Sequence, residues 1–190
     1  MKTKFILFIV TVIALSSCTN VMFETSVPKN AEILSEFPKD VVGMFSDGKK
    51  DTLLFTEDSF EFGISKQSNL ISGALTDGKS ELKRQGDYLY LNIKSDEGLW
   101  TVFPFQVKDN GLDVYAFIVE LLKEKLDSSM TDNEKEDKII DEINNITRVK
   151  TILNSDSNDK EYLIDPTNKE LYELMDKGYF VKIGEFKRLK

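Results

Sequence analysis

One thiol and many carboxylates are the side chains of this sequence that could carry chemistry. The 190-residue chain has 33 acidic and 25 basic residues, no histidine, and a single cysteine at position 18. Without histidine, the commonest general base and the commonest transition-metal ligand are missing. The composition therefore excludes Ser-His-Asp and Cys-His catalysis and the usual zinc sites, and a lone cysteine excludes a disulfide within the chain.

The residues before Cys18 indicate a particular use for its thiol. Two lysines precede an uncharged apolar run from Phe5 to Leu15, and the small residues Ser16 and Ser17 lead to the cysteine. This pattern is typical of a secretory signal peptide, and the run is shorter than the roughly 20 residues of a membrane-spanning helix. We expect residues 1–17 to be a leader that is cleaved between Ser17 and Cys18. The alternative is an ordinary signal peptide in which the cysteine is incidental.

The stretch Leu15-Ser16-Ser17-Cys18 resembles the lipobox of bacterial lipoproteins. The resemblance implies that Cys18 receives a diacylglyceryl group and that the new amino terminus is often acylated too. The whole chain is similar to small lipoproteins of Gram-negative bacteria, especially of the Bacteroidota type, a likeness that implies no particular activity. It implies a lipid anchor in the cell envelope, on the outer membrane facing the periplasm, because Thr19 is not the aspartate of inner-membrane retention. In a Gram-positive source the anchor would lie in the plasma membrane.

The charge balance limits the partners. The net charge is −8, and removal of the leader with its two lysines takes it to −10. We expect no nucleic-acid partner, because phosphate binding needs a basic face and no Lys/Arg cluster stands out. Acidity also disfavours anionic lipid surfaces, so membrane attachment depends on the acyl chains of Cys18. We expect no cofactor, and a protein of the envelope is a possible partner.

The mature chain divides into a linker and one domain. Residues 18–38 contain two prolines and no clear period, which favours a lipidated tether. The alternative is that part of this segment packs on the domain, because Ile33, Leu34 and Phe37 are apolar. Residues 39–190 are long enough for a single domain with a sizeable core.

The fold class predicted for this domain is α+β. The first half reads as an antiparallel β meander, in the form of a curled sheet or partial barrel. The expected strands are 41–45, 52–56, 59–64, 70–75, 80–84, 88–93, 99–107 and 112–117. Pro104 lacks an N–H group, so the strand that contains it is expected at an edge or with a bulge.

Helices and a β-hairpin are expected in the C-terminal half. Residues 118–126 show a helical period, and capping boxes at Thr131 and Thr167 predict the starts of two more helices. The predicted hairpin has strands 149–153 and 161–164, and a last strand covers 179–186.

Several strands have apolar residues on both faces. Either helices cover the second face, or the sheet curls around an apolar ligand. Tyr88, Tyr90 and Trp100 could stack on a sugar or bind an acyl chain, but an aromatic stripe more often belongs to a core.

One turn carries a weak calcium pattern. Asn154, Asp156 and Asn158 have the 1-3-5 spacing of an EF-hand loop, and Asp165 falls at position 12. Asp159 replaces the glycine of that loop, and the flanks read as strands. A solvated hairpin turn, in which such residues are common, is the favoured interpretation.

Three functions remain open at this point. The first is a non-catalytic, membrane-anchored interaction or accessory domain, and the second is a binding protein for a lipid or other apolar ligand. The third is a carboxylate-dependent hydrolase, which needs two acids in one cleft. The acids available for it fall mostly in expected turns: Asp47, Glu57, Asp58, Glu61, Asp87, Asp96 and Glu97.

Overall fold

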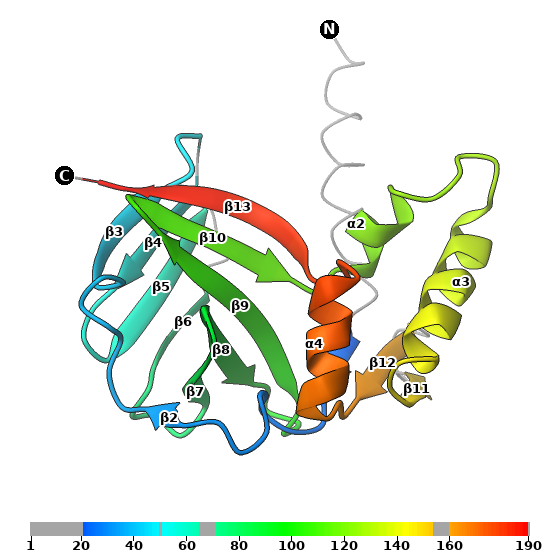
Figure 1. The fold of residues 1–190 in the computed structure, drawn as a ribbon, viewed down its shortest axis with the longest axis horizontal. Coiled ribbons are helices and arrows are strands. Elements are labelled where there is room, and N and C mark those ends of the chain that lie inside the picture. The colour runs from blue at the N-terminus through cyan, green and yellow to red at the C-terminus, as the bar shows by residue number, and fades with distance from the viewer. Residues whose placement is uncertain (1–20, 50, 65–70, 154–159, 190) are drawn as a thin grey trace, which may run out of the picture.

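The described residues form one branched β-sheet with three short helices at one end (Figure 1). The structure is a computed structural model and describes residues 21–49, 51–64, 71–153 and 160–189. Its strands are β1 (Val21–Phe23), β2 (Ile33–Leu34), β3 (Gly43–Ser46), β4 (Asp51–Phe55), β5 (Ser59–Ile64), β6 (Ile71–Ala74), β7 (Ser80–Gln85), β8 (Tyr88–Lys94), β9 (Trp100–Lys108), β10 (Gly111–Ala116), β11 (Val149–Leu153), β12 (Lys160–Ile164) and β13 (Val181–Arg188). Its helices are α2 (Val119–Lys123), α3 (Asp132–Asn144) and α4 (Asn168–Asp176).

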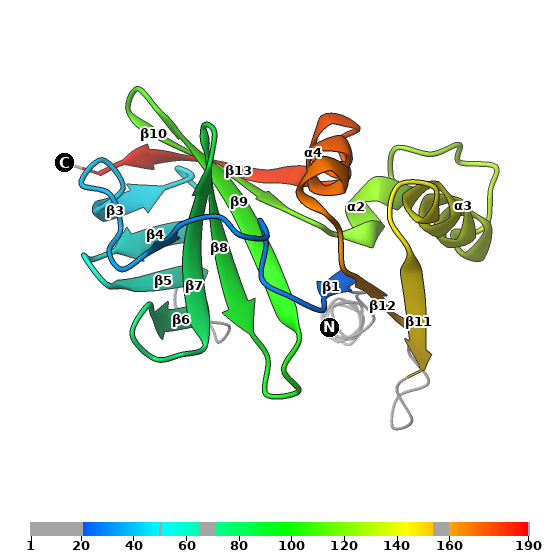
Figure 2. The same ribbon diagram turned by 60° about the horizontal axis from the view of Figure 1, so that its bottom comes forward.

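The first half is an antiparallel meander, as the alternating apolar residues and turns predict. Strands β3 to β6 pair with their neighbours in chain order, and so do β7 to β10. β13 lies between β10 and β3, so that the sheet curls back as a partial barrel (Figure 2). The α+β class with a curled meander, helices and a hairpin is therefore confirmed.

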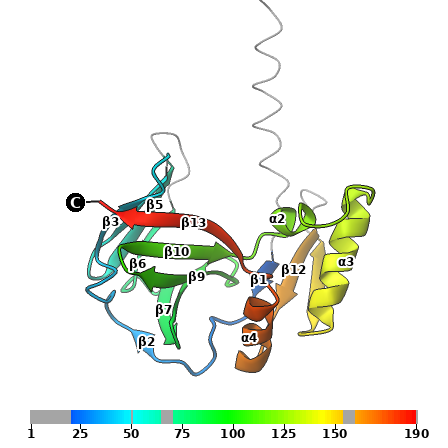
Figure 3. The same ribbon diagram turned by 45° about the horizontal axis from the view of Figure 1, so that its top comes forward.

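The helices begin at the predicted threonines. Thr131 accepts a hydrogen bond from the Glu134 N–H, and the Glu134 carboxylate accepts one from the Thr131 N–H at 2.7 Å. Thr167 and Glu170 repeat this capping box at α4, which satisfies donors that the first helical turn leaves free. Gly178, at φ +76°, ends α4 in the left-handed conformation that glycine adopts most easily. The β11–β12 hairpin lies beside α3 (Figure 3).

Strands β8 and β9 contribute to two separate cores. Tyr90, Trp100 and Val102 are buried with the helices, β1 and β12. Leu91 and Phe105, from the opposite face, are buried inside the curl of the sheet. Helices thus cover one face and the curled sheet covers the other. Tyr90 and Trp100 are only 1% and 8% exposed, so they belong to a core as favoured.

The prediction of a tether is wrong for residues 21–38, which pack on the domain. β1 pairs in parallel with β12 and antiparallel with β9, and Val21 and Phe23 are buried there. Val27 and Phe37 are buried further along, and β2 pairs with β7. Apolar burial outweighs the two prolines, which lie between the short strands instead of within them.

Hydrogen bonds fasten this segment to the sheet and to α4. The Asn92 side chain accepts from the Val27 N–H and donates to the Val27 carbonyl, both at 2.8 Å, and also donates to the Tyr90 carbonyl at 3.1 Å. Asn168 holds the main chain of Lys29 in the same two-sided way, at 2.7 and 2.8 Å. Amide side chains thereby replace strand pairing where the segment has none.

The Asn92 contacts predict a stability effect. Asn92→Leu should lower the free energy of unfolding by about 3 kcal/mol, because it leaves the buried Val27 N–H and carbonyl without partners. Urea unfolding followed by circular dichroism measures this difference. Asn133→Ala, at an exposed position of α3, is the matched control and should change stability little. Equal stability of Asn92→Leu and the wild type would contradict the assigned role.

Candidate functional site

The residues predicted for lipidation, cleavage and calcium binding fall mostly outside the described part of the chain. Ser17 and Cys18 precede it, and Asn154, Asp156 and Asn158 lie in the gap between β11 and β12. Lipidation and cleavage therefore stay predictions. Within the described residues, no group of three or more His, Cys, Asp or Glu side chains could hold a metal ion.

Asp165, the described member of the calcium pattern, is bound to other side chains. Its carboxylate is 2.7 Å from the Lys29 ammonium group and accepts a hydrogen bond from the Thr25 hydroxyl at 2.6 Å. Partial burial acts to raise the pKa of Asp165, but the bonds from Lys29 and Thr25 outweigh it and lower the pKa below its ordinary value. This carboxylate joins the N-terminal segment to the start of α4.

The lowered pKa of Asp165 predicts a pH-dependent contribution to stability. Because the folded-state pKa is depressed, the stabilisation is present above the unfolded-state pKa and is lost as the pH falls through the folded one. Asp165→Asn should therefore cost about 1 kcal/mol at pH 7, a value that allows for partial exposure. The cost should begin to shrink near pH 4, where the unfolded-state carboxylate binds a proton, and should shrink further as the pH falls through the lower pKa of the folded state.

Urea unfolding of Asp165→Asn and the wild type at pH 7 and pH 3 tests this dependence. Asp109→Asn, in an exposed turn, is the matched control. A cost for Asp165→Asn that is the same at both pH values would show that the charge of the carboxylate does not matter.

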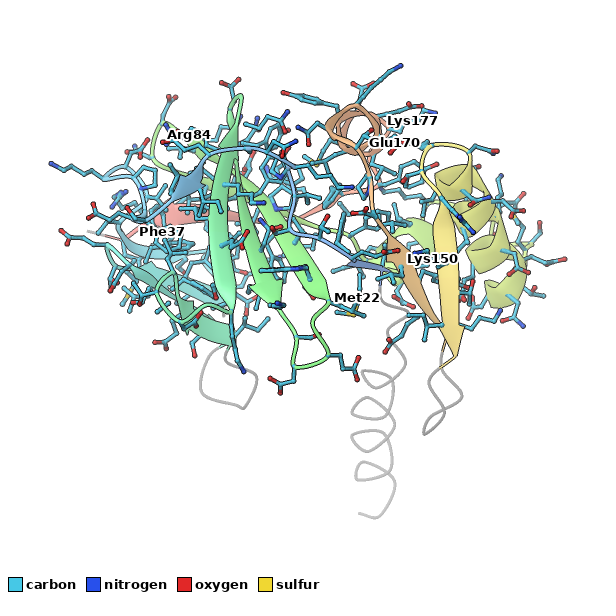
Figure 4. All side chains as sticks on the ribbon, turned by 90° about the horizontal axis from the view of Figure 1, so that it is seen from below. Met22, Phe37, Arg84, Lys150, Glu170 and Lys177 are labelled. Carbon is cyan, nitrogen blue, oxygen red and sulfur yellow. The ribbon has the colours of Figure 1, made fainter. Side chains whose placement is uncertain are left out.

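The acids of the hydrolase alternative are spread over four turns, apart from Glu61, which lies within β5. Asp47 accepts bonds within the β3–β4 turn, Asp58 bonds Thr56 in the β4–β5 turn, and Asp96 pairs with Lys79 beside the β8–β9 turn. A polar pocket of about 330 Å³ lies at the ends of β7 to β9 and is lined by Arg84, Asp87 and other exposed charged residues (Figure 4). Such side chains are well solvated, and nothing in their arrangement selects an acid/base pair.

Two tyrosines with strongly raised pKa values have structural roles. Burial, with a hydrogen bond to Glu136, raises the pKa of Tyr162. Burial, with a hydrogen bond to Glu142, raises the pKa of Tyr179 to about 12. Both phenols therefore stay neutral at physiological pH and donate to carboxylates of α3, which holds this helix against β12 and the end of α4.

An apolar groove forms where the sheet divides. β9 pairs with β10 from Phe105 to Lys108 and with β1 only at Trp100. Over residues 101–104, all of which the structure describes, its ladder is with β8 alone. β9 has partners on both flanks at Trp100 and at residues 105–106, so it is an interior strand. The edge position expected for Pro104 exists locally, at residues 101–104. A proline is tolerated there because that flank of the strand has no partner to bond.

The groove consists of two adjoining clefts that share Phe103 and Ile183. The β1 cleft, of about 280 Å³, is lined by Val21–Phe23, residues 101–103, residues 116–118 and Ile183. The β6 cleft, of about 170 Å³, is lined by residues 51–53, Phe62, Gly63, Ile71, Phe103, Ile183 and Phe186. Together they run from β1 to the edge strand β6 and are walled mainly by aliphatic and aromatic side chains.

A β-bulge places Ile183 between the two clefts. Val114 pairs with Gly184 and Tyr115 pairs with Lys182, so Ile183 has no partner in β10. Bulges are common next to functional sites because they redirect a side chain. Ile183 is 43% exposed, as is Ile71. In β1, Val21 and Phe23 face the core, so alternation turns Met22 to the opposite side.

Sequence reasoning missed this groove. It considered an apolar ligand inside a curled sheet, but it treated residues 179–186 as one uninterrupted strand. The usable signal was Gly184, because a glycine inside a strand often marks a bulge. In the structure, a Cβ at this position would clash with the Phe186 ring.

Comparison with known proteins adds no assignment to this geometry. Neither a protein-family model, nor a curated protein, nor a solved structure matches the chain. Among the described residues, no helix is both long and apolar enough to span a bilayer.

Proposed function

We propose that the protein is a lipid-anchored, non-catalytic domain of the cell envelope that binds an apolar ligand in the groove. The observation that carries this proposal is the pair of apolar clefts joined at Phe103 and Ile183. The ligand class is a lipid acyl chain or a molecule of similar character.

The size and lining of the groove support this ligand class. An apolar cavity of about 150 Å³ holds a molecule as large as benzene, and ligand sites commonly start near 300 Å³. The β1 cleft alone, at about 280 Å³, approaches that range, and the β6 cleft extends it. Asp51 is the charged residue of the lining and belongs to the β6 cleft. A polar ligand would find few partners here, whereas an apolar chain buries surface along the whole groove.

The sequence around Cys18 supports the anchor. Acylation of this cysteine after removal of residues 1–17 would hold the domain on a membrane, with the outer membrane facing the periplasm as the proposed location. Two or more acyl chains bind a membrane firmly, whereas one binds marginally. The absence of histidine supports a role without catalysis.

Ligand binding can be tested with a fluorescent fatty acid. Ile183→Ser should weaken its binding about tenfold, because the loss of apolar contact in the middle of the groove is worth about 1.4 kcal/mol. Ile152→Ser in β11 is the matched control, since Ile152 is 39% exposed and is not among the groove residues. Equal affinities of the two variants, or no binding by the wild type, would contradict the proposed ligand site.

The anchor can be tested by labelling with palmitate. Cells that express the full chain should incorporate labelled palmitate into it, and Cys18→Ala should abolish the label because no other thiol is present. Ser17→Ala keeps the cysteine and a small residue before it, and should remain labelled. Palmitate that persists in Cys18→Ala, or a product that retains residues 1–17, would overturn the anchor.

A second candidate is an interaction or accessory domain with a protein partner, and the edge strand β11 favours it. Among the described strands, β11 pairs with β12 alone, and Thr151 and Ile152 are exposed on it. An open edge can accept a strand from a partner protein. Capture of a specific envelope protein by the acyl-free domain supports this candidate, provided that Ile152→Pro, which blocks strand addition, abolishes the capture.

A further inference from the structure

We infer that the rim of the apolar groove, formed by Met22, Ile71 and Ile183, rests on the lipid bilayer that holds the anchor. This inference rests on the proposed acylation of Cys18. The groove would then have a lipid surface as its second partner. An apolar ligand could pass directly between the bilayer and the groove.

The first argument is the length of chain between the anchor and the groove. β1 begins at Val21 and is fixed by pairing with β12 and β9. Thr19 and Asn20 alone separate it from Cys18. An extended chain spans at most about 3.6 Å per residue, so the Cα atoms of Cys18 and Val21 lie no more than about 11 Å apart. Val21 itself lines the groove, and an anchor on Cys18 therefore holds the groove close to the bilayer.

The second argument is the direction of the rim side chains. Ile71 and Ile183 are each 43% exposed and line the same β6 cleft. Met22 lines the adjoining β1 cleft, and in Figure 4 its side chain projects on the side of the molecule opposite to α4, which carries Glu170 and Lys177. Met22 and the charged helix thus lie on different sides of the molecule, and the short linker favours contact of the bilayer with the side of Met22.

The third argument is the charge of the domain. With a net charge of −8 for the full chain, electrostatic attraction to anionic lipids cannot hold the domain on a membrane. Contact between the domain and the membrane must therefore come from apolar side chains, and zwitterionic lipids are the expected surface. Because the anchor keeps the rim at a high effective concentration near the surface, weak apolar contacts are sufficient.

The experiment attaches the domain to lipid through its natural anchor position. Residues 18–190 retain every described element, and Cys18 is the single thiol, so maleimide-headgroup lipid in phosphatidylcholine vesicles couples there alone. Tryptophan is introduced by Ile183→Trp at the rim and by Tyr172→Trp on α4, where Tyr172 is 49% exposed. The wild type, whose single tryptophan Trp100 is buried, gives the background emission that is subtracted from each variant. Phosphatidylcholine with brominated acyl chains then quenches whichever tryptophan reaches the bilayer.

We expect quenching in Ile183→Trp to exceed that in Tyr172→Trp by about twofold or more, since interfacial apolar side chains enter the acyl boundary. Met22→Ser combined with Ile71→Ser should reduce the quenching at position 183. Equal quenching in the two tryptophan variants overturns the inference. So does a rim tryptophan that lipid does not quench but whose emission shifts to the blue at high surface density, because a second copy then covers the rim.

The coupling chemistry makes this outcome independent of the proposed function. Maleimide attachment works whether or not cells acylate Cys18, so absent quenching overturns docking alone. Absent palmitate label overturns the natural anchor, and unchanged fatty-acid affinity in Ile183→Ser overturns the ligand site.

Discussion

The structure depends on one constraint: β9 has apolar residues on both faces, and both must be buried. Trp100 and Val102 are buried by the helices, β1 and β12, whereas Phe105 is buried inside the curled meander. A single strand therefore serves two cores, and its partner on one flank changes from β10 to β1 along its length. The division of the sheet at residues 101–104 is the geometric result, and the groove lies at this division.

Features that depend on neighbours in sequence could be predicted, and features that join distant residues could not. The capping boxes at Thr131 and Thr167 act over three residues, and the strands of the meander are separated by short turns, so local patterns were sufficient. The parallel pairing of β1 with β12, and the contact of Lys29 with Asp165, join positions more than a hundred residues apart. No local pattern encodes such a pairing, which explains why residues 21–38 resembled a tether.

The candidate groove could not be predicted from the sequence. Apolar residues on both faces of β8 and β9 indicated either a covered core or a sheet curled around an apolar ligand, and the structure buries core side chains on both faces. The position of the groove is set by the unpaired stretch of β9 and by the bulge at Ile183. Both are properties of strand register, which depends on which strands meet, and Gly184 was the one local signal of the bulge.

The anchor and the rim would make different contributions at a membrane: the anchor supplies affinity, and the rim sets the orientation of the domain. Burial of an exposed isoleucine is worth about 1 kcal/mol when less than half of its surface is available. Ile71 and Ile183, each 43% exposed, therefore supply too little free energy to hold an acidic domain on lipid without an anchor. Acyl chains supply the affinity but do not set the orientation of a domain on a flexible tether. A two-residue linker into a fixed strand changes this, because it allows weak apolar contacts beside the anchor to decide which face meets the bilayer.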